Sequence, residues 1–206
     1  MALGLLCAVL GIANRYKIFY RMEPLLFSDV AQLGDAWQAA AGLALDIPPE
    51  KCAAALREYM PSGMRQKVVH WRGITVVEDC YNASPDSMRA ALETLAGHPC
   101  TGRRIAVLGG MLELGAISER AHREIGAFAA EKGIDLLLAY GGDACYYRQG
   151  ASEGGIPVEL FGDKEELLAR LREEIRPGDA VWVKGSRGMR MEEILEGLYK
   201  GEVVNE

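Results

Sequence analysis

From residue 74 onward, short aliphatic segments alternate with segments of helical period, and this alternation constrains the fold more than any other feature. The segments expected to be strands are ITVVEDCY, RRIAVLGG, DLLLAY, VELF and AVWVKG, at residues 74–81, 103–110, 135–140, 158–161 and 180–185. Most of them show little polar alternation, which is typical of strands covered on both faces. The sequence therefore predicts an α/β fold with a doubly wound, mostly parallel sheet flanked by helices.

The segments between these strands carry apolar residues at spacings of three and four, which place each set on one face of a helix. We expect these faces to pack in the core. Their members are Met88, Ala91, Leu92 and Leu95; Ala121, Ile125, Phe128 and Ala129; Leu167, Leu168, Leu171 and Ile175; and Met191, Ile194, Leu195 and Leu198.

Residues 1–70 do not share this alternation, and we place a domain boundary between residues 70 and 71. The first 27 residues have no clear period, whereas 28–46 and 48–60 have the composition and start signals of helices. The segment KVVHW, at 67–71, is expected to form a strand that pairs with 74–81 around a short turn. The apolar start MALGLLCAVLGI lacks a basic residue and is too short to span a bilayer, so neither a signal peptide nor a membrane anchor is expected.

Charge and cysteine usage exclude several classes of function. The formal net charge is −6, which argues against a general nucleic-acid surface because such a surface needs a basic face. The five cysteines are scattered without a C-x-x-C pair, as expected of reduced thiols rather than of a disulfide framework or a zinc site. The three histidines have no spacing typical of metal ligands, so no metal site is predicted. We expect His122, inside SERAHREIGAF, to be either hydrogen bonded in place or on a helix surface.

Ligands of doubly wound sheets gather at the carboxyl ends of the strands, so three loops are candidate sites. In the loop 79–84, helix capping explains the residues from Ser84 onward but leaves Asp79, Tyr81 and Asn82 as either ligand contacts or an ordinary turn. The loop 109–115, GGMLELG, matches neither glycine-rich phosphate motif, and its glycines are expected to allow a sharp turn.

The third loop, KGSRG at 184–188, is expected to lead directly into the last helix. Lys184, Ser186, Arg187 and the helix N-terminus could together bind a carboxylate or phosphate, or form a solvated basic turn. Arg65, in SGMRQ, could be a surface charge or a phosphate contact, and sequence spacing leaves both open.

Three ordered stretches together resemble the carboxyl-terminal domain of the Mur ligases: EDCYNASPDSMRAAL, AVLGGMLELG and VWVKGSRGMRMEEIL. The resemblance runs from about residue 36 to residue 198 and is densest over 61–198. It implies a Rossmann-like domain at 71–206, preceded at 1–70 by an irregular N-terminus and a helical remnant of the central ATPase domain. It also implies a cytoplasmic enzyme of peptidoglycan synthesis. With ATP and Mg²⁺, such an enzyme activates a carboxylate as an acyl phosphate, which an amine then attacks.

The match is best to the family members that add D-alanyl-D-alanine to the UDP-N-acetylmuramoyl peptide. Carried over by motif, the resemblance implies nucleotide contacts for one set of residues and contacts to the incoming substrate for another. The nucleotide set is Arg65, Asp79, Tyr81 and Asn82, and the substrate set is Lys184, Ser186 and Arg187.

This chain departs from the family pattern at several points. Gly110 replaces the acid of the usual GDM, and Ala31 and Asp35 stand where the family has His and Asn. No GKT P-loop occurs in the sequence, and the family's Mg²⁺ ligands are missing as well. We therefore expect a carboxyl-terminal portion that is inactive alone. The alternatives are a non-catalytic Rossmann-like binding or interaction module, and the C-terminal domain of another Mur-type or folylpolyglutamate ligase.

Overall fold

The computed structural model describes residues 42, 45, 47–57 and 65–200, and the chain divides into two compact units, residues 1–60 and 61–206. In the first unit, helix α4 (Pro49–Arg57) begins at a proline and carries Glu50 in its first turn, where an acid complements the helix dipole. The helix expected at 28–46 and the apolar start lie almost wholly outside the described residues. The boundary expected between residues 70 and 71 falls inside the first strand of the second unit.

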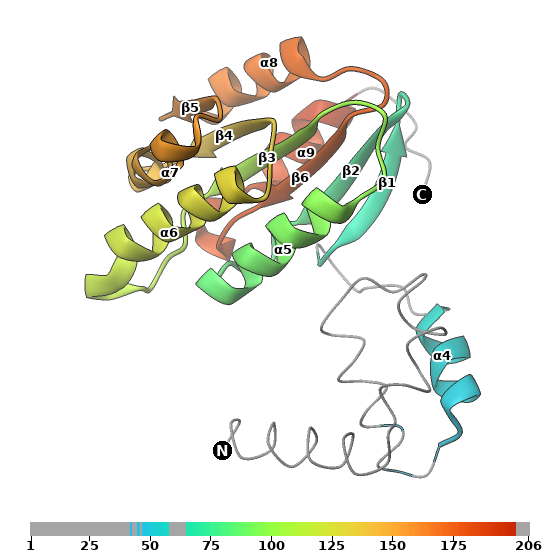
Figure 1. Cartoon of the computed structure of the whole chain (residues 1–206). Helices are drawn as coiled ribbons and strands as arrows, with labels where there is room; N and C mark the ends of the chain where they lie inside the picture. Colours follow the sequence, from blue (N-terminus) through green and yellow to red (C-terminus); the bar gives the residue numbers. More distant parts are fainter. Residues whose placement is uncertain (1–41, 43–44, 46, 58–64, 201–206) are drawn as a thin grey trace. The chain divides into compact units, whose positions relative to one another are not determined.

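The second unit is built on one six-stranded sheet with the order β1-β2-β6-β3-β4-β5 (Figure 1). Strands β1 and β2 are antiparallel, as their short connection requires, and the other neighbours are parallel. This confirms the predicted fold class. The strands are β1 (Lys67–Trp71), β2 (Ile74–Asp79), β3 (Arg104–Gly109), β4 (Leu136–Tyr140), β5 (Val158–Phe161) and β6 (Ala180–Lys184).

Helices cover both faces of this sheet (Figure 1). Helices α5 (Pro85–Gly97), α6 (Ser118–Glu131) and α7 (Ala144–Ala151) pack on one face, and their buried side chains form one core cluster. Helices α8 (Lys164–Glu174) and α9 (Glu192–Tyr199) contribute to the second cluster, on the opposite face. The predicted apolar faces of α5, α6, α8 and α9 face the core, with Phe128 and Leu168 only partly buried.

Helix α7 is absent from the sequence prediction because small residues conceal its buried face. Gly126 of α6 and Gly150 of α7 bring the two helices into close contact. A Cβ at Gly126 would lie 2.0 Å from the Tyr147 carbonyl oxygen, and one at Gly150 would lie 1.8 Å from the Arg123 carbonyl oxygen. An interface made by backbone approach leaves no stripe of large apolar residues to detect.

The order of the strands places three loops side by side. Strand β6 lies between β2 and β3, and all three strands run parallel, so their carboxyl ends share one edge of the sheet. The helices that follow β2 and β3 pack on one face, whereas α9 follows β6 on the other face. The chain therefore leaves β6 toward one face of the sheet and leaves its neighbours β2 and β3 toward the other face. Doubly wound sheets bind ligands where adjacent connections diverge in this way.

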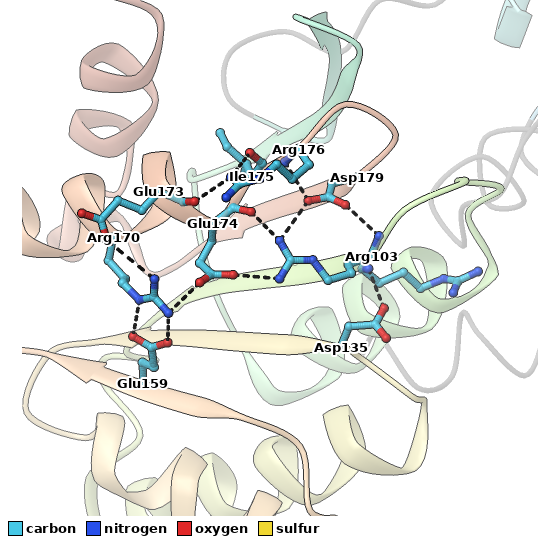
Figure 2. Close-up of polar contacts among 10 residues, drawn as sticks. Arg103, Asp135, Glu159, Arg170, Glu173, Glu174, Ile175, Arg176 and Asp179 are labelled. Atoms are coloured by element: carbon cyan, nitrogen blue, oxygen red, sulfur yellow. Dashed lines mark hydrogen bonds and ion pairs between the residues drawn. The ribbon is translucent and has the colours of Figure 1, made fainter.

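An ion-pair network joins the segments at the opposite, amino-terminal edge (Figure 2). Asp179, which is buried just before β6, accepts a hydrogen bond from the Arg103 backbone N–H at 2.8 Å. The Arg103 guanidinium pairs with Glu174 of α8 at 2.7 Å. Arg170 makes two hydrogen bonds of 2.8 Å to Glu159 of β5 and also pairs with Glu174 at 2.6 Å. The network thus ties α8 to the starts of two central strands and to the edge strand.

Candidate functional site

A buried ion pair links the carboxyl ends of β2 and β6. Asp79 and Lys184 are opposite each other in the register of these strands, and Lys184 Nζ lies 2.7 Å from Asp79 Oδ2. Both residues are at most 5% exposed. Lys184 Nζ also donates to the Asn82 carbonyl oxygen at 2.9 Å. Asp79 therefore neutralises the lysine charge inside the protein, and Lys184 holds the loop that follows β2 in place.

Ser186 connects the three loops to one another. Its N–H donates to the Gly110 carbonyl oxygen at 3.1 Å, and its Oγ accepts from the Leu112 N–H at 2.9 Å. The same hydroxyl donates to the Ala83 carbonyl oxygen at 3.4 Å. Because Ser186 is only 4% exposed, it acts as an internal bridge between the loops after β2, β6 and β3.

The glycines of the loops after β3 and β6 allow these backbones to approach closely. A Cβ at Gly185 would lie 2.7 Å from Met191 Cγ and 3.2 Å from the Gly109 Cα. Of the loop's glycines, which are expected to allow a sharp turn, Gly115 has a positive φ of 55°, whereas Gly109 and Gly110 do not. Close packing is the reason for Gly109, where an added Cβ would lie 2.8 Å from Met191 Sδ.

Three of the predicted nucleotide residues form an exposed rim beside this buried framework. Tyr81 is 48% exposed, and the Arg65 guanidinium lies over its ring, 3.9 Å from the ring centroid. Asn82 is exposed, and its Oδ1 accepts from the Ala83 N–H at 2.8 Å, which leaves the amide NH₂ directed away from that bond. Ser84 and Ser87 complete a capping box at the start of α5, as the sequence predicts for Ser84.

Arg187 is the accessible cation of the last loop. Its side chain is 59% exposed and pairs with Glu192 at 2.9 Å. The loop does not lead directly into a helix, because the turn Arg187–Met189 has 3₁₀ geometry and α9 begins only at Glu192. The helix N-terminus expected to contribute to an anion site here is therefore displaced along the chain. Arg190, between the two, has a left-handed backbone with a φ of 48°.

Two further residues affect the chemistry of this edge. Burial raises the pKa of the Cys80 thiol to about 12, and its Sγ lies 3.5 Å from the Val183 carbonyl oxygen, so this cysteine is not a nucleophile. Tyr147 of α7 supports the loop after β3, because its hydroxyl donates to the Gly109 carbonyl oxygen at 2.9 Å. Tyr147 is not among the predicted residues, although Ala144, Tyr147 and Ala151 stand at spacings of three and four, which mark one face of a helix.

Within the described residues, no cluster of three or more metal-ligating side chains is found. The described helices also include none that is long and apolar enough to cross a membrane.

Comparison with known proteins identifies the family. The model of the Mur ligase glutamate ligase domain matches residues 64–187, which is more than half of the chain. The chain belongs to the Mur ligase family. UDP-N-acetylmuramoyl-tripeptide–D-alanyl-D-alanine ligase of Bacillus subtilis is 36% identical over 164 residues, covering 78% of this chain and 36% of the relative. The same-named protein of Escherichia coli is 38% identical over 127 residues, covering 61% of this chain and 27% of the relative.

Solved structures give the same result. MurF from Acinetobacter baumannii superimposes with a TM-score of 0.67 at 29% identity, covering 77% of this chain and 35% of that structure. MurF from Thermotoga maritima, solved in complex with ADP, gives a TM-score of 0.63 at 26% identity with the same coverage. The chain therefore spans about a third of the length of the relatives it matches. These findings confirm the resemblance to the Mur ligase C-terminal domain, with MurF proteins as similar members.

Proposed function

We propose that this chain is the carboxyl-terminal portion of a cytoplasmic ATP- and Mg²⁺-dependent amide ligase of peptidoglycan synthesis. The complete enzyme would add D-alanyl-D-alanine to the UDP-N-acetylmuramoyl peptide. The names of the similar proteins support this assignment. The observation that carries it is the convergence of the three motif loops at the carboxyl ends of β2, β6 and β3, with an exposed rim that Arg65 forms together with the loop after β2.

The rim fits an adenine nucleotide in its chemistry. Tyr81 offers a half-exposed ring for stacking, Asn82 an amide that donates and accepts, and Arg65 a cation for a phosphate. Because Arg65 already covers one face of the ring, a base would stack on the other face or displace the guanidinium. ATP, when bound, would supply the phosphoryl group that activates the carboxylate, and we assign no residue of this chain to Mg²⁺.

The remaining predicted residues divide into contact and support. Arg187 is accessible and can bind a carboxylate, such as that of the incoming dipeptide. Asp79, Lys184 and Ser186 are buried, so we propose that they hold the loops in place. The motif resemblance implies that all seven residues contact nucleotide or substrate, whereas this division assigns no ligand contact to Asp79, Lys184 and Ser186.

Two measurements test the proposal. With UDP-N-acetylmuramoyl peptide, D-alanyl-D-alanine and MgATP, we expect no ADP release from the purified chain, because the sequence has no P-loop to hold the β- and γ-phosphates. Isothermal titration should detect weak ADP binding that Tyr81→Ala and Asn82→Ala each reduce about tenfold, as expected for the loss of one stacking contact or one hydrogen bond.

Arg172→Gln is the control for this titration, since Arg172 is an exposed cation near the carboxyl end of α8, away from the three loops. Its affinity for ADP should equal that of the unmodified chain. Robust turnover would contradict the expected inactivity. An absence of ADP binding would favour a non-catalytic interaction module over a retained nucleotide rim.

A further inference from the structure

His122 of α6 lies directly behind the loop that follows β3. Its side chain is fully buried and hydrogen bonded, so the expectation of a satisfied histidine is confirmed and that of a helix-surface position is wrong. The Met111 backbone N–H donates to His122 Nε2 at 2.9 Å. The other ring nitrogen, Nδ1, lies 2.7 Å from the Ser118 carbonyl oxygen. The ring thus bridges the backbone of α6 and the backbone of the loop.

These two contacts fix the protonation state of the ring. A backbone N–H can only donate and a carbonyl oxygen can only accept, so Nε2 must be unprotonated and Nδ1 must carry the hydrogen. Only the neutral ring with its proton on Nδ1 satisfies both. A second proton, on Nε2, would face the Met111 N–H and break that hydrogen bond.

A partner for the protonated ring is already present. Asp143 Oδ2 lies 4.0 Å from His122 Nε2 and accepts a hydrogen bond from Ser118 Oγ at 3.1 Å. The Tyr147 ring, on α7, stands 4.9 Å from the imidazole, and burial keeps it neutral by raising its pKa above the ordinary value. Among the described residues, Asp143 is the charged side chain that lies within ion-pair distance of His122.

We propose that His122 is a positioning residue of the candidate site. When neutral, it holds the loop at Met111, and when protonated it turns to Asp143 and releases the loop. The other side of the same loop is bonded to Ser186, which also reaches the loop after β2 at Ala83. Release at Met111 therefore loosens the support of the exposed rim. This last consequence rests on the proposed nucleotide site, whereas the release itself does not.

The first test observes the full chain without any ligand. Nitrogen-15 NMR of the histidine side chains distinguishes the two tautomers, and we expect His122 to carry its proton on Nδ1 at about pH 8. Amide hydrogen exchange, corrected for the intrinsic rate and compared at about pH 8 and about pH 5, should show the Met111 protection factor falling about tenfold on acidification. A proton on Nε2, or a Met111 protection factor independent of pH, would overturn the proposal.

Two variants separate positioning from simple packing. In His122→Gln, a side-chain oxygen can still accept from the Met111 N–H but does not titrate, so protection should persist and lose its pH dependence. In His122→Leu, a similar volume without an acceptor should lower the Met111 protection factor about tenfold at every pH. A Met111 protection factor in His122→Leu equal to that of the unmodified chain at about pH 8, or a pH dependence kept in His122→Gln, would contradict the assigned role. If either variant fails to fold, the tautomer and the exchange profile of the unmodified chain still decide.

ADP titration then tests the consequence for the site. Because ADP itself changes charge in this pH range, affinities are compared between the unmodified chain and His122→Gln at each pH. We expect the ADP affinity of the unmodified chain, divided by that of His122→Gln, to fall about threefold to tenfold on acidification. The reason is that part of the hydrogen bond's contribution is transmitted through Ser186. A constant ratio would refute coupling between His122 and the rim. A failure of ADP to bind at any pH would count against the proposed nucleotide function, and the exchange experiment would still decide the role of His122.

Discussion

Replacing Lys184 by methionine tests the view that this lysine supports the site from within. The change keeps the side-chain volume but removes the charge that lies 2.7 Å from Asp79 Oδ2. At an effective dielectric constant of about 20, that separation corresponds to an attraction of roughly 6 kcal/mol before desolvation is subtracted. The Asn82 carbonyl oxygen also loses its donor. Leaving a buried carboxylate unpaired costs about 3–5 kcal/mol, which is a large fraction of the stability of an ordinary domain.

The assay is urea unfolding followed by tryptophan fluorescence. In a Trp37→Phe background, the two remaining tryptophans, Trp71 and Trp182, both lie in the sheet and report on its unfolding. We expect Lys184→Met to lower the free energy of unfolding by about 3–5 kcal/mol. A decrease in the free energy of unfolding of less than about 1 kcal/mol would refute the reasoning, because it would mean that the pair between Lys184 and Asp79 contributes little to stability.

A second variant controls for the effect of the methionine itself. In Asp79→Leu/Lys184→Met, both charges are removed, and replacing a whole buried pair by apolar residues is often close to neutral. The double variant should therefore recover to within about 2 kcal/mol of the unmodified chain. If the double variant is less stable than Lys184→Met alone, the unpaired Asp79 carboxylate is not the cause of the instability of the single variant.

Three further predictions concern other parts of the sheet unit. A hydrogen bond from Arg103 lowers the pKa of Glu174 below its ordinary value of 4.5, so the unfolded chain binds the proton more readily. Stability is then lost as the pH falls through that lowered pKa, and Glu174→Gln should flatten the acid side of a urea-midpoint profile below about pH 5. Iodoacetamide at about pH 8 should modify the partly exposed Cys145 while leaving buried Cys80 unlabelled in peptide mass spectra, since the Cys80 pKa is about 12. Gly185→Ala should lower the free energy of unfolding by about 1–3 kcal/mol, because its Cβ would lie 2.7 Å from Cγ of the buried Met191, and an unchanged urea midpoint would contradict this.

The fold could be predicted because its signals are local. Each strand from β2 to β6 is a short aliphatic run, and four of the five flanking helices show their buried face in the spacing of apolar residues. Strands β4 and β5 end where predicted, whereas β2, β3 and β6 end one or two residues earlier, since Cys80, Gly110 and Gly185 already belong to the loops. Hydrophobicity does not distinguish such residues from strand residues, because they remain buried where they pack between the strand ends.

The organisation of the candidate site could not be predicted, because its contacts join residues far apart in the sequence. Asp79 and Lys184 are 105 positions apart and become neighbours only because β6 is inserted beside β2. Nothing near either residue in the sequence indicates that their charges neutralise each other. Likewise, the pattern around His122 shows a histidine on a helix, whereas its role depends on the backbone of Met111 in another loop.

Burial now separates residues that the motifs group together. Arg65, Tyr81 and Arg187 reach solvent and can touch a ligand, whereas Lys184 and Ser186 are enclosed and bonded to the backbone of neighbouring loops. A loss of ADP affinity on replacing a buried member would therefore be accompanied by a loss of stability, because the same contacts serve both. Replacing an exposed member should reduce affinity while leaving the free energy of unfolding within about 0.5 kcal/mol, as is usual for surface positions. Measuring both quantities for each variant thus distinguishes the ligand contacts from the framework that holds them, and a stable Lys184 variant with lost affinity would place that lysine among the contacts.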